Sequence, residues 1–241
     1  MNSQAIEKAT GHGTPYLEVH SIFYTIQGEG PFAGKPAVFV RLAGCNLQCP
    51  LCDTDYTSKR LKYLPEQVRA EIHAHALREH FAGNLVVITG GEPFRQANLR
   101  LLVDELLQYG HKVQIETNGT LYQELDFEHP ALTVVCSPKT GKVHPELEPW
   151  IKAFKYVLHA DQLNPEDGLP LRALDHTAHP QVARPSKEWK QWRCLSGEIY
   201  VQPVDVGDEV QNRRHLDATV QSAMRYNYRL CLQQHKIIGL E

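Results

Sequence analysis

Three cysteines lie close together in this sequence. Cys45, Cys49 and Cys52 form the pattern C-x3-C-x2-C, which supplies three thiolates from one short loop. A cubane iron–sulfur cluster normally takes four cysteines, so three would leave one iron open to a substrate or cosubstrate. The alternative is a structural zinc ion completed by one of thirteen histidines. Such zinc sites usually combine two short cysteine knuckles, and no second knuckle exists here. We therefore favour a four-iron, four-sulfur cluster that takes part in chemistry.

Several polar segments each follow a run of residues typical of a buried strand. In Thr89–Pro93 the paired glycines let the backbone approach a ligand closely, and Glu92 can accept a hydrogen bond from an ammonium group. The other segments are Glu116–Gly119, Ser137-Pro138-Lys139 and Gln202-Pro203-Val204-Asp205. Active sites of parallel barrels gather at the carboxyl ends of strands. We therefore expect these segments and the cysteine loop to meet at one mouth.

The elements that must position these segments alternate along the chain. Strand-like runs occur at Ala37–Leu42, Leu85–Thr89, Lys112–Glu116, Leu132–Cys136, Ala153–Leu158 and Ile199–Gln202. Helical periodicity covers Leu64–His80, Leu99–Leu107 and Asp208–Tyr226, the last with Leu216, Val220, Ala223 and Met224 on one stripe. Alternating strands and helices favour a parallel sheet with crossover helices. About six strands are too few for a closed eight-stranded barrel. We predict an α/β fold, an incomplete TIM-like barrel with N- and C-terminal additions.

Composition limits the possible functions. The 241 residues fit a single domain over 15–241, preceded by a flexible tail at 1–14. The polar, proline-dotted stretch 161–193 is expected to be an excursion or long loop. A net charge of -3 without a basic block does not favour nucleic-acid binding, and no apolar stretch is long enough to span a membrane. Clustered cysteines favour metal binding in a reducing cytoplasm. Cys136, Cys194 and Cys231 are expected to be buried or incidental thiols.

The cysteine loop, followed by Thr89–Pro93, resembles the radical S-adenosylmethionine (SAM) superfamily. The resemblance implies that SAM chelates the open iron through its amino and carboxylate groups. The reduced cluster then cleaves SAM to methionine and a deoxyadenosyl radical, while the protein orients the cofactor. The expected SAM contacts are Leu51, Asp53, Gly91, Glu92, Glu116, Ser137, Pro138, Lys139, Gln202 and Asp205.

A longer run of residues narrows the resemblance. Tyr24–Pro36 and Phe39–Thr54, together with the C-terminal residues, closely resemble the 7-carboxy-7-deazaguanine synthases of the queuosine pathway. The resemblance implies a carboxylated tetrahydropterin as substrate, with Arg41 clamping its carboxylate as a bidentate fork. It also implies that Thr54 binds Mg²⁺, a hard ion with few protein ligands. The remaining implied substrate contacts are Ile26, Gln27, Gly28, Glu29, Thr89 and the terminal carboxylate of Glu241.

Two other functions stay open on the sequence. A radical SAM activase that generates a glycyl radical on a partner enzyme would share the cysteine loop but lack Gln27, Arg41 and Thr54 as a set. A non-catalytic zinc or electron-transfer module would bind no SAM. For the favoured function we expect a reductant such as flavodoxin as partner, and the family resemblance implies a homodimer.

Overall fold

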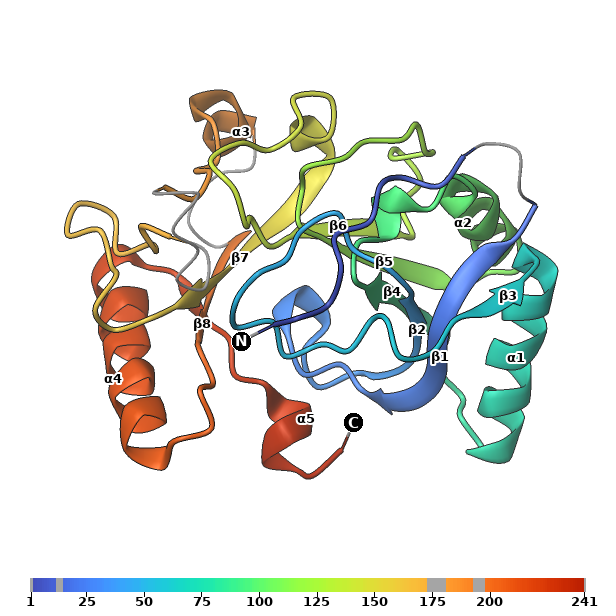
Figure 1. Cartoon of the computed structure of the whole chain (residues 1–241), viewed down its shortest axis with the longest axis horizontal. Coiled ribbons are helices and arrows are strands. Elements are labelled where there is room, and N and C mark those ends of the chain that lie inside the picture. Colours follow the sequence, from blue (N-terminus) through green and yellow to red (C-terminus); the bar gives the residue numbers. More distant parts are fainter. Residues whose placement is uncertain (1, 12–14, 173–180, 193–197, 241) are drawn as a thin grey trace.

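The computed structural model describes residues 2–11, 15–172, 181–192 and 198–240. They form one nine-stranded sheet with helices packed on its outer face (Figure 1). The strands are β1 (Leu17–Ile26), β2 (Pro36–Leu42), β3 (Leu61–Tyr63), β4 (Leu85–Gly90), β5 (Lys112–Thr117), β6 (Leu132–Cys136), β7 (Ile151–Leu158), β8 (Ile199–Pro203) and β9 (Arg229–Leu230). The helices are α1 (Pro65–Arg78), α2 (Leu99–Gln108), α3 (Lys187–Trp192), α4 (Glu209–Tyr226) and α5 (Gln234–Ile237), with 3-10 turns at Gly30–Phe32, Pro93–Arg95 and Glu148–Trp150.

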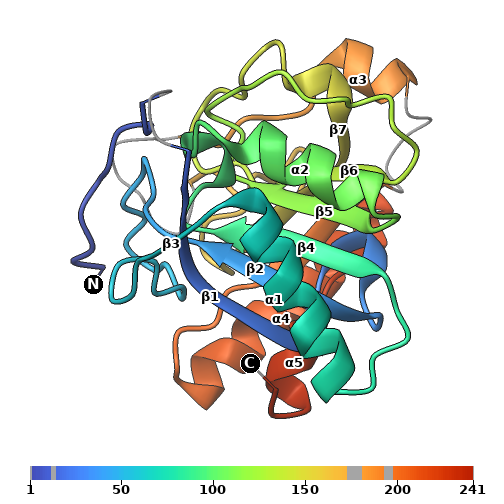
Figure 2. The same ribbon diagram turned by 90° about the vertical axis from the view of Figure 1, so that its right-hand side faces the viewer.

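The sheet order is β3-β1-β2-β4-β5-β6-β7-β8-β9. Strands β2 and β4 to β8 form one parallel set, which confirms the six predicted strands and the incomplete barrel. At one edge β1 and β3 pair antiparallel, and at the other edge the two-residue β9 extends the parallel set. The two edge strands do not pair with each other, so the curved sheet stays open (Figure 2).

Crossover helices cover the outer face of the sheet, as their sequences predict. On α2 the buried residues Leu99, Leu102 and Leu106 recur at three and four, and Gly110 follows with a positive φ of 80°. Helix α4 begins after Asp208, whose carboxylate accepts a hydrogen bond from the Gln211 N–H. Its buried face differs from the predicted stripe.

The α4 stripe was predicted from the apolar residues of the helix. Instead, α4 buries His215, Thr219 and Ser222 with Ala223, whereas Met224 is 81% exposed. The buried polar groups have internal partners: Ser222 Oγ donates to the carbonyl oxygen of Gly168. The apolar periodicity therefore predicted only part of this face: Ala223 is buried and Leu216 and Val220 are half-buried, but Met224 is exposed.

The chain beyond the sheet lies mostly in loops. Residues 2–11, here called the N-terminal arm, run along the cysteine loop (Figure 1). The flexibility expected for 1–14 stays a prediction. The described part of 161–193 is loop and turn apart from α3. Cys136 and Cys231 are buried free thiols, as expected, and Cys194 lies outside the described residues. Within the described part of the chain, no helix is long and apolar enough to cross a bilayer.

Candidate active site

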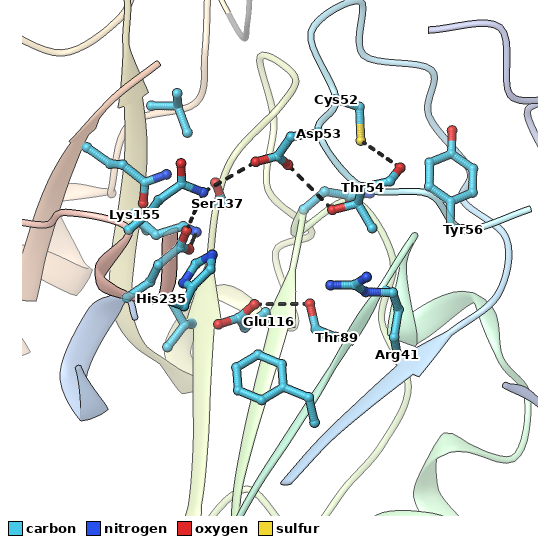
Figure 3. Close-up of a pocket in the computed structure, with 18 of the residues that line it drawn as sticks. Arg41, Cys52, Asp53, Thr54, Tyr56, Thr89, Glu116, Ser137, Lys155 and His235 are labelled. Atoms are coloured by element: carbon cyan, nitrogen blue, oxygen red, sulfur yellow. Dashed lines mark hydrogen bonds and ion pairs between the residues drawn. The ribbon is translucent and has the colours of Figure 1, made fainter. Parts of the chain in front are cut away.

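A cavity of about 440 Å³ opens at the carboxyl ends of the parallel strands. Figure 3 shows Arg41, Thr89 and Glu116 along one side of it, and Cys52 with Asp53 and Thr54 along the facing side. The predicted site residues that line it are Ile26, Gln27, Glu29, Arg41, Cys45, Cys49, Leu51, Cys52, Asp53, Thr54, Thr89, Gly91, Glu116, Ser137, Lys139, Gln202 and Asp205. The predicted convergence of strand ends on one mouth is therefore present in the structure.

The cysteine loop follows β2 and places its three thiols on the cavity wall. Cys45 and Cys49 are each 8% exposed. Burial, with a contribution from Glu92, raises the pKa of Cys45 to about 12, and burial also raises the pKa of Cys49 and Cys52. Thiolates in this position therefore need a bound cation.

The spacing of the possible metal ligands bears on whether a single zinc ion or an iron–sulfur cluster would bind here. Among the described residues, no three His, Cys, Asp or Glu side chains come close enough to hold one metal ion. A mononuclear zinc site needs such convergence. A cubane does not, because each cysteine binds a different iron. Three thiols on one cavity wall are a suitable ligand set for such a cluster.

The Thr89–Pro93 segment packs directly against the cysteine loop. The Gly91 N–H donates to the Leu42 carbonyl oxygen at 3.2 Å, and the Glu92 N–H donates to the Gly44 carbonyl oxygen at 3.0 Å. A Cβ on Gly91 would lie 2.1 Å from the Gly44 oxygen and 2.9 Å from Cys45 Cβ. The glycine therefore permits the close approach of two backbones that both border the cavity.

Glu92 is not among the residues that line the cavity. It is 0% exposed, and its carboxylate accepts from Thr117 Oγ1 at 2.7 Å, the Asn118 N–H at 2.7 Å and the Phe94 N–H at 3.0 Å. Burial raises its pKa to about 7, although these donors oppose the rise. In this structure Glu92 joins the ends of β4 and β5, and a contact between Glu92 and SAM stays a prediction.

Glu116 lines the cavity and accepts hydrogen bonds from three neighbouring side chains. Its Oε1 accepts from the side-chain amides of Gln27 and Gln114, each at 3.0 Å, and its Oε2 accepts from Thr89 Oγ1 at 3.0 Å. Arg41 lies beside Thr89 in the parallel register of β2 and β4, with its guanidinium 5.1 Å from the centre of the Phe23 ring. Strands β1, β2, β4 and β5 thus bring one carboxylate, one guanidinium, one hydroxyl and two amides together.

Charged residues complete the cavity, and among them Glu29 and Lys139 were predicted from the sequence whereas Lys155 was not. Lys155 of β7 lines it (Figure 3) and forms an ion pair with Glu29. Both groups are largely buried; the Lys155 ammonium and the Gln233 amide outweigh burial and lower the pKa of Glu29. The signal for Lys155 was a lysine inside a mostly apolar strand, Ile151–Leu158, which also contains Lys152. Lys139 also lines the cavity, donates to Ser137 Oγ at 2.5 Å, and has its pKa lowered by burial.

The C-terminal segment, residues 233–240, forms another wall of the cavity. Gln233, His235, Lys236 and Leu240 line it, and none was predicted as a site residue. Lys236 Nζ lies 3.0 Å from Asp53 Oδ2 and 3.3 Å from Asp205 Oδ2. Burial raises the pKa of Asp53, but the Lys236 ammonium and the Gln233 amide outweigh it and lower the pKa to about 2.

Three predicted site residues do not line the cavity. Gly28 is covered by this C-terminal segment: a Cβ there would meet His235 Nδ1 at 2.1 Å. Pro138 is buried, and neither it nor Glu92 is among the lining residues. Glu241 lies outside the described residues.

Comparison with known proteins agrees with this geometry. Residues 40–131 match the model of the radical SAM superfamily. A protein of Rhodospirillum rubrum named 7-carboxy-7-deazaguanine synthase is 44% identical over 93% of this chain and 92% of its own length. One of the same name from Rickettsia prowazekii is 38% identical over 96% and 92%. The crystal structure of QueE from Escherichia coli shares the fold, with a TM-score of 0.63 and 24% identity over 91% and 95% of the chains. The chain therefore belongs to the 7-carboxy-7-deazaguanine synthase family of radical SAM enzymes.

Proposed function

We propose that this enzyme converts 6-carboxy-5,6,7,8-tetrahydropterin into 7-carboxy-7-deazaguanine and ammonia, with SAM used catalytically, in queuosine and 7-deazapurine biosynthesis. The observation that carries the proposal is the single cavity in which the cysteine loop, Gly91 and the Arg41–Glu116 floor meet. Family membership supports a lyase of this name over a glycyl-radical activase or an electron-transfer module. A cavity with apolar walls and a few placed polar groups suits a small bicyclic substrate.

Cys45, Cys49 and Cys52 would hold the cluster, and the expected SAM contacts surround them. When bound, the cluster and SAM would supply a deoxyadenosyl radical that takes hydrogen from C6 of the substrate and later returns it. The protein's contribution is position: Gly91 lets the backbone after β4 approach the cysteine loop, and Lys139 places a cation beside Cys49 and Cys52.

The substrate would lie with its carboxylate at Arg41, whose planar guanidinium suits two parallel hydrogen bonds. Its amino and amide edge would face the Gln27 amide and the carboxylates of Glu29 and Glu116, which supply acceptors for N–H groups. Lys155 keeps the Glu29 carboxylate ionised and therefore able to accept. This arrangement would fix the pterin ring between the strand ends and the cysteine loop.

Thr54, together with the substrate carboxylate, would hold Mg²⁺, which would supply positive charge to stabilise the ring contraction. Thr54 Oγ1 lies 3.5 Å from Asp53 Oδ1, so two hard oxygen donors are side by side on the cavity wall. Thr54→Ala should flatten the dependence of rate on magnesium concentration. An unchanged magnesium titration would contradict this ligand.

The proposal includes a cytoplasmic homodimer reduced by a flavodoxin-type partner, with neither nucleic acid nor membrane required. The deciding experiment uses anaerobically reconstituted protein with SAM, reductant and Mg²⁺. Carboxypterin should yield 7-carboxy-7-deazaguanine and one ammonia, whereas the same pterin without its carboxylate should yield neither. Loaded protein that makes deoxyadenosine but no deazaguanine would refute the substrate assignment, and failure to bind iron would refute the enzyme class.

A further inference from the structure

The cysteine loop has little regular structure of its own. Between β2 and β3 the backbone runs through turns and bends, with a single isolated β-bridge at Cys45. A segment without a helix or sheet ladder must satisfy its buried N–H and C=O groups elsewhere. Here the N-terminal arm supplies many of these hydrogen-bond partners. The arm lies beside the loop in both views (Figures 1 and 2).

The first half of the arm binds the region around the second and third cysteines. The Asn2 N–H donates to the Pro50 carbonyl oxygen at 3.1 Å, and Asn2 Nδ2 donates to the Cys49 carbonyl oxygen at 3.1 Å. Gln4 Nε2 donates to the Thr54 carbonyl oxygen at 2.9 Å, while Gln4 Oε1 accepts from the Tyr56 N–H at 2.8 Å. One glutamine side chain therefore satisfies a backbone carbonyl group and a backbone N–H group just after the third cysteine.

The second half of the arm binds the first cysteine. Ile6 forms a parallel bridge with Cys45, and the Glu7 N–H donates to the Cys45 carbonyl oxygen at 2.8 Å. The Glu7 carboxylate lies between Arg60 and Arg95, and the Arg95 side chain is only 5% exposed. Ile6 itself is 63% exposed, so the arm is held by polar contacts and not by burial of apolar surface.

We propose that the N-terminal arm is a positioning element of the cluster site, with Gln4 as its central residue. The arm donates hydrogen bonds to the backbone carbonyl oxygens of Cys45, Cys49 and Thr54. These bonds fix the geometry of the loop on both sides of the thiols. Loosening it would let the thiols spread and expose the cluster to water and oxygen. The inference rests on the proposed function, because it assumes a cluster held by these three cysteines.

The test compares Gln4→Ala with Gln221→Ala, a matched removal of an exposed glutamine on α4 that makes no described contact. Each full-length variant is reconstituted anaerobically, its iron content is measured, and the loss of cluster absorbance is followed in air. Gln4→Ala removes three hydrogen bonds to the loop, because Gln4 Oε1 also accepts from Thr57 Oγ1. Its cluster should decay about tenfold faster, which corresponds to about 1.4 kcal/mol.

A second measurement separates positioning from general destabilisation. The melting temperature of the cluster-free Gln4→Ala protein should equal that of Gln221→Ala, since the effect acts on the loop. Equal cluster half-times for both variants would overturn the inference, and so would faster decay fully matched by global unfolding. If cluster-free Gln4→Ala is unfolded, Asn2→Ala is judged by the same criteria. Wild-type protein that takes up no iron would instead refute the proposed function.

Discussion

Replacing Gly91 by alanine should damage the cluster site more than it damages the fold. A Cβ at this position would lie 2.1 Å from the Gly44 oxygen and 2.5 Å from the Gly44 carbonyl carbon, whereas real Cβ contacts are essentially never below 3.0 Å. Both contacts are to backbone, so no side chain can rotate away. The segment after β4 and the cysteine loop must therefore separate by about 0.9 Å, more than the ~0.5 Å tolerance of a pre-organised site.

The energetic cost follows from overpacking. We expect a loss of about 2 kcal/mol, which for a chain of this length lowers the melting temperature by roughly 4–8 °C. Iron bound after reconstitution should fall as well, because Cys45 Cβ lies 2.9 Å from the added carbon. Calorimetry of cluster-free protein and an iron assay measure the two effects separately.

Gly141→Ala is the matched control. Its Cβ would meet only the Gln181 oxygen, at an ordinary 3.5 Å, and its φ lies outside the left-handed region. The control should be neutral or slightly more stable, because alanine restricts the unfolded chain. If Gly91→Ala equals Gly141→Ala in melting temperature and iron content, the argument that this glycine seats the cysteine loop is refuted.

Three other changes probe separate parts of the structure. Arg41→Ala should weaken carboxypterin binding roughly 10- to 100-fold and leave SAM binding nearly intact; titrations that show equal loss of both would argue against a carboxylate clamp. Gly28→Ala should displace the C-terminal segment, because its Cβ would collide with His235 Nδ1 at 2.1 Å and approach the His235 backbone nitrogen at 2.9 Å; trypsin should then cut after Lys236 faster, and an unchanged cleavage rate would contradict this packing. Burial lowers the pKa of His215 below 6.5, and its Nδ1 accepts a hydrogen bond from the Ala160 N–H at 3.1 Å. The unfolded chain therefore binds the proton more readily than the folded protein. His215 should thus destabilise the fold as the pH drops below 6.5. Urea midpoints measured against pH should therefore slope less for His215→Gln than for wild type, and equal slopes would count against the neutral buried ring.

The central strands could be predicted from sequence because most of them contain a short apolar run that the sheet buries. Strand β4, Leu85–Gly90, is typical: its first four residues are buried. Strand β1 was not predicted, because its burial follows no simple alternation, and β9 has only two residues. The α4 stripe was only partly right, because tertiary partners such as the Gly168 carbonyl allow polar groups to be buried there.

Site residues at the ends of consecutive strands could be predicted from the sequence. Site residues that reach the cavity from distant segments of the chain could not. Thr89 and Glu116 end consecutive parallel strands, so their meeting at one edge follows from topology. Lys155 lies inside a strand, and Lys236 reaches Asp53 only after the chain has passed the whole sheet. No local pattern in the C-terminal segment encodes that contact. The same holds for Gln4, which lies in a segment whose composition suggested only a tail.

The ratio of product formed to SAM consumed tests the proposed reaction most directly. Reconstituted enzyme is given carboxypterin in large excess over SAM, and deazaguanine, ammonia, methionine and deoxyadenosine are counted at the end. Return of hydrogen to the cofactor predicts many deazaguanines per SAM lost and one ammonia per deazaguanine. One methionine and one deoxyadenosine for every turnover, or their accumulation without any deazaguanine, would contradict the reaction proposed for this cavity.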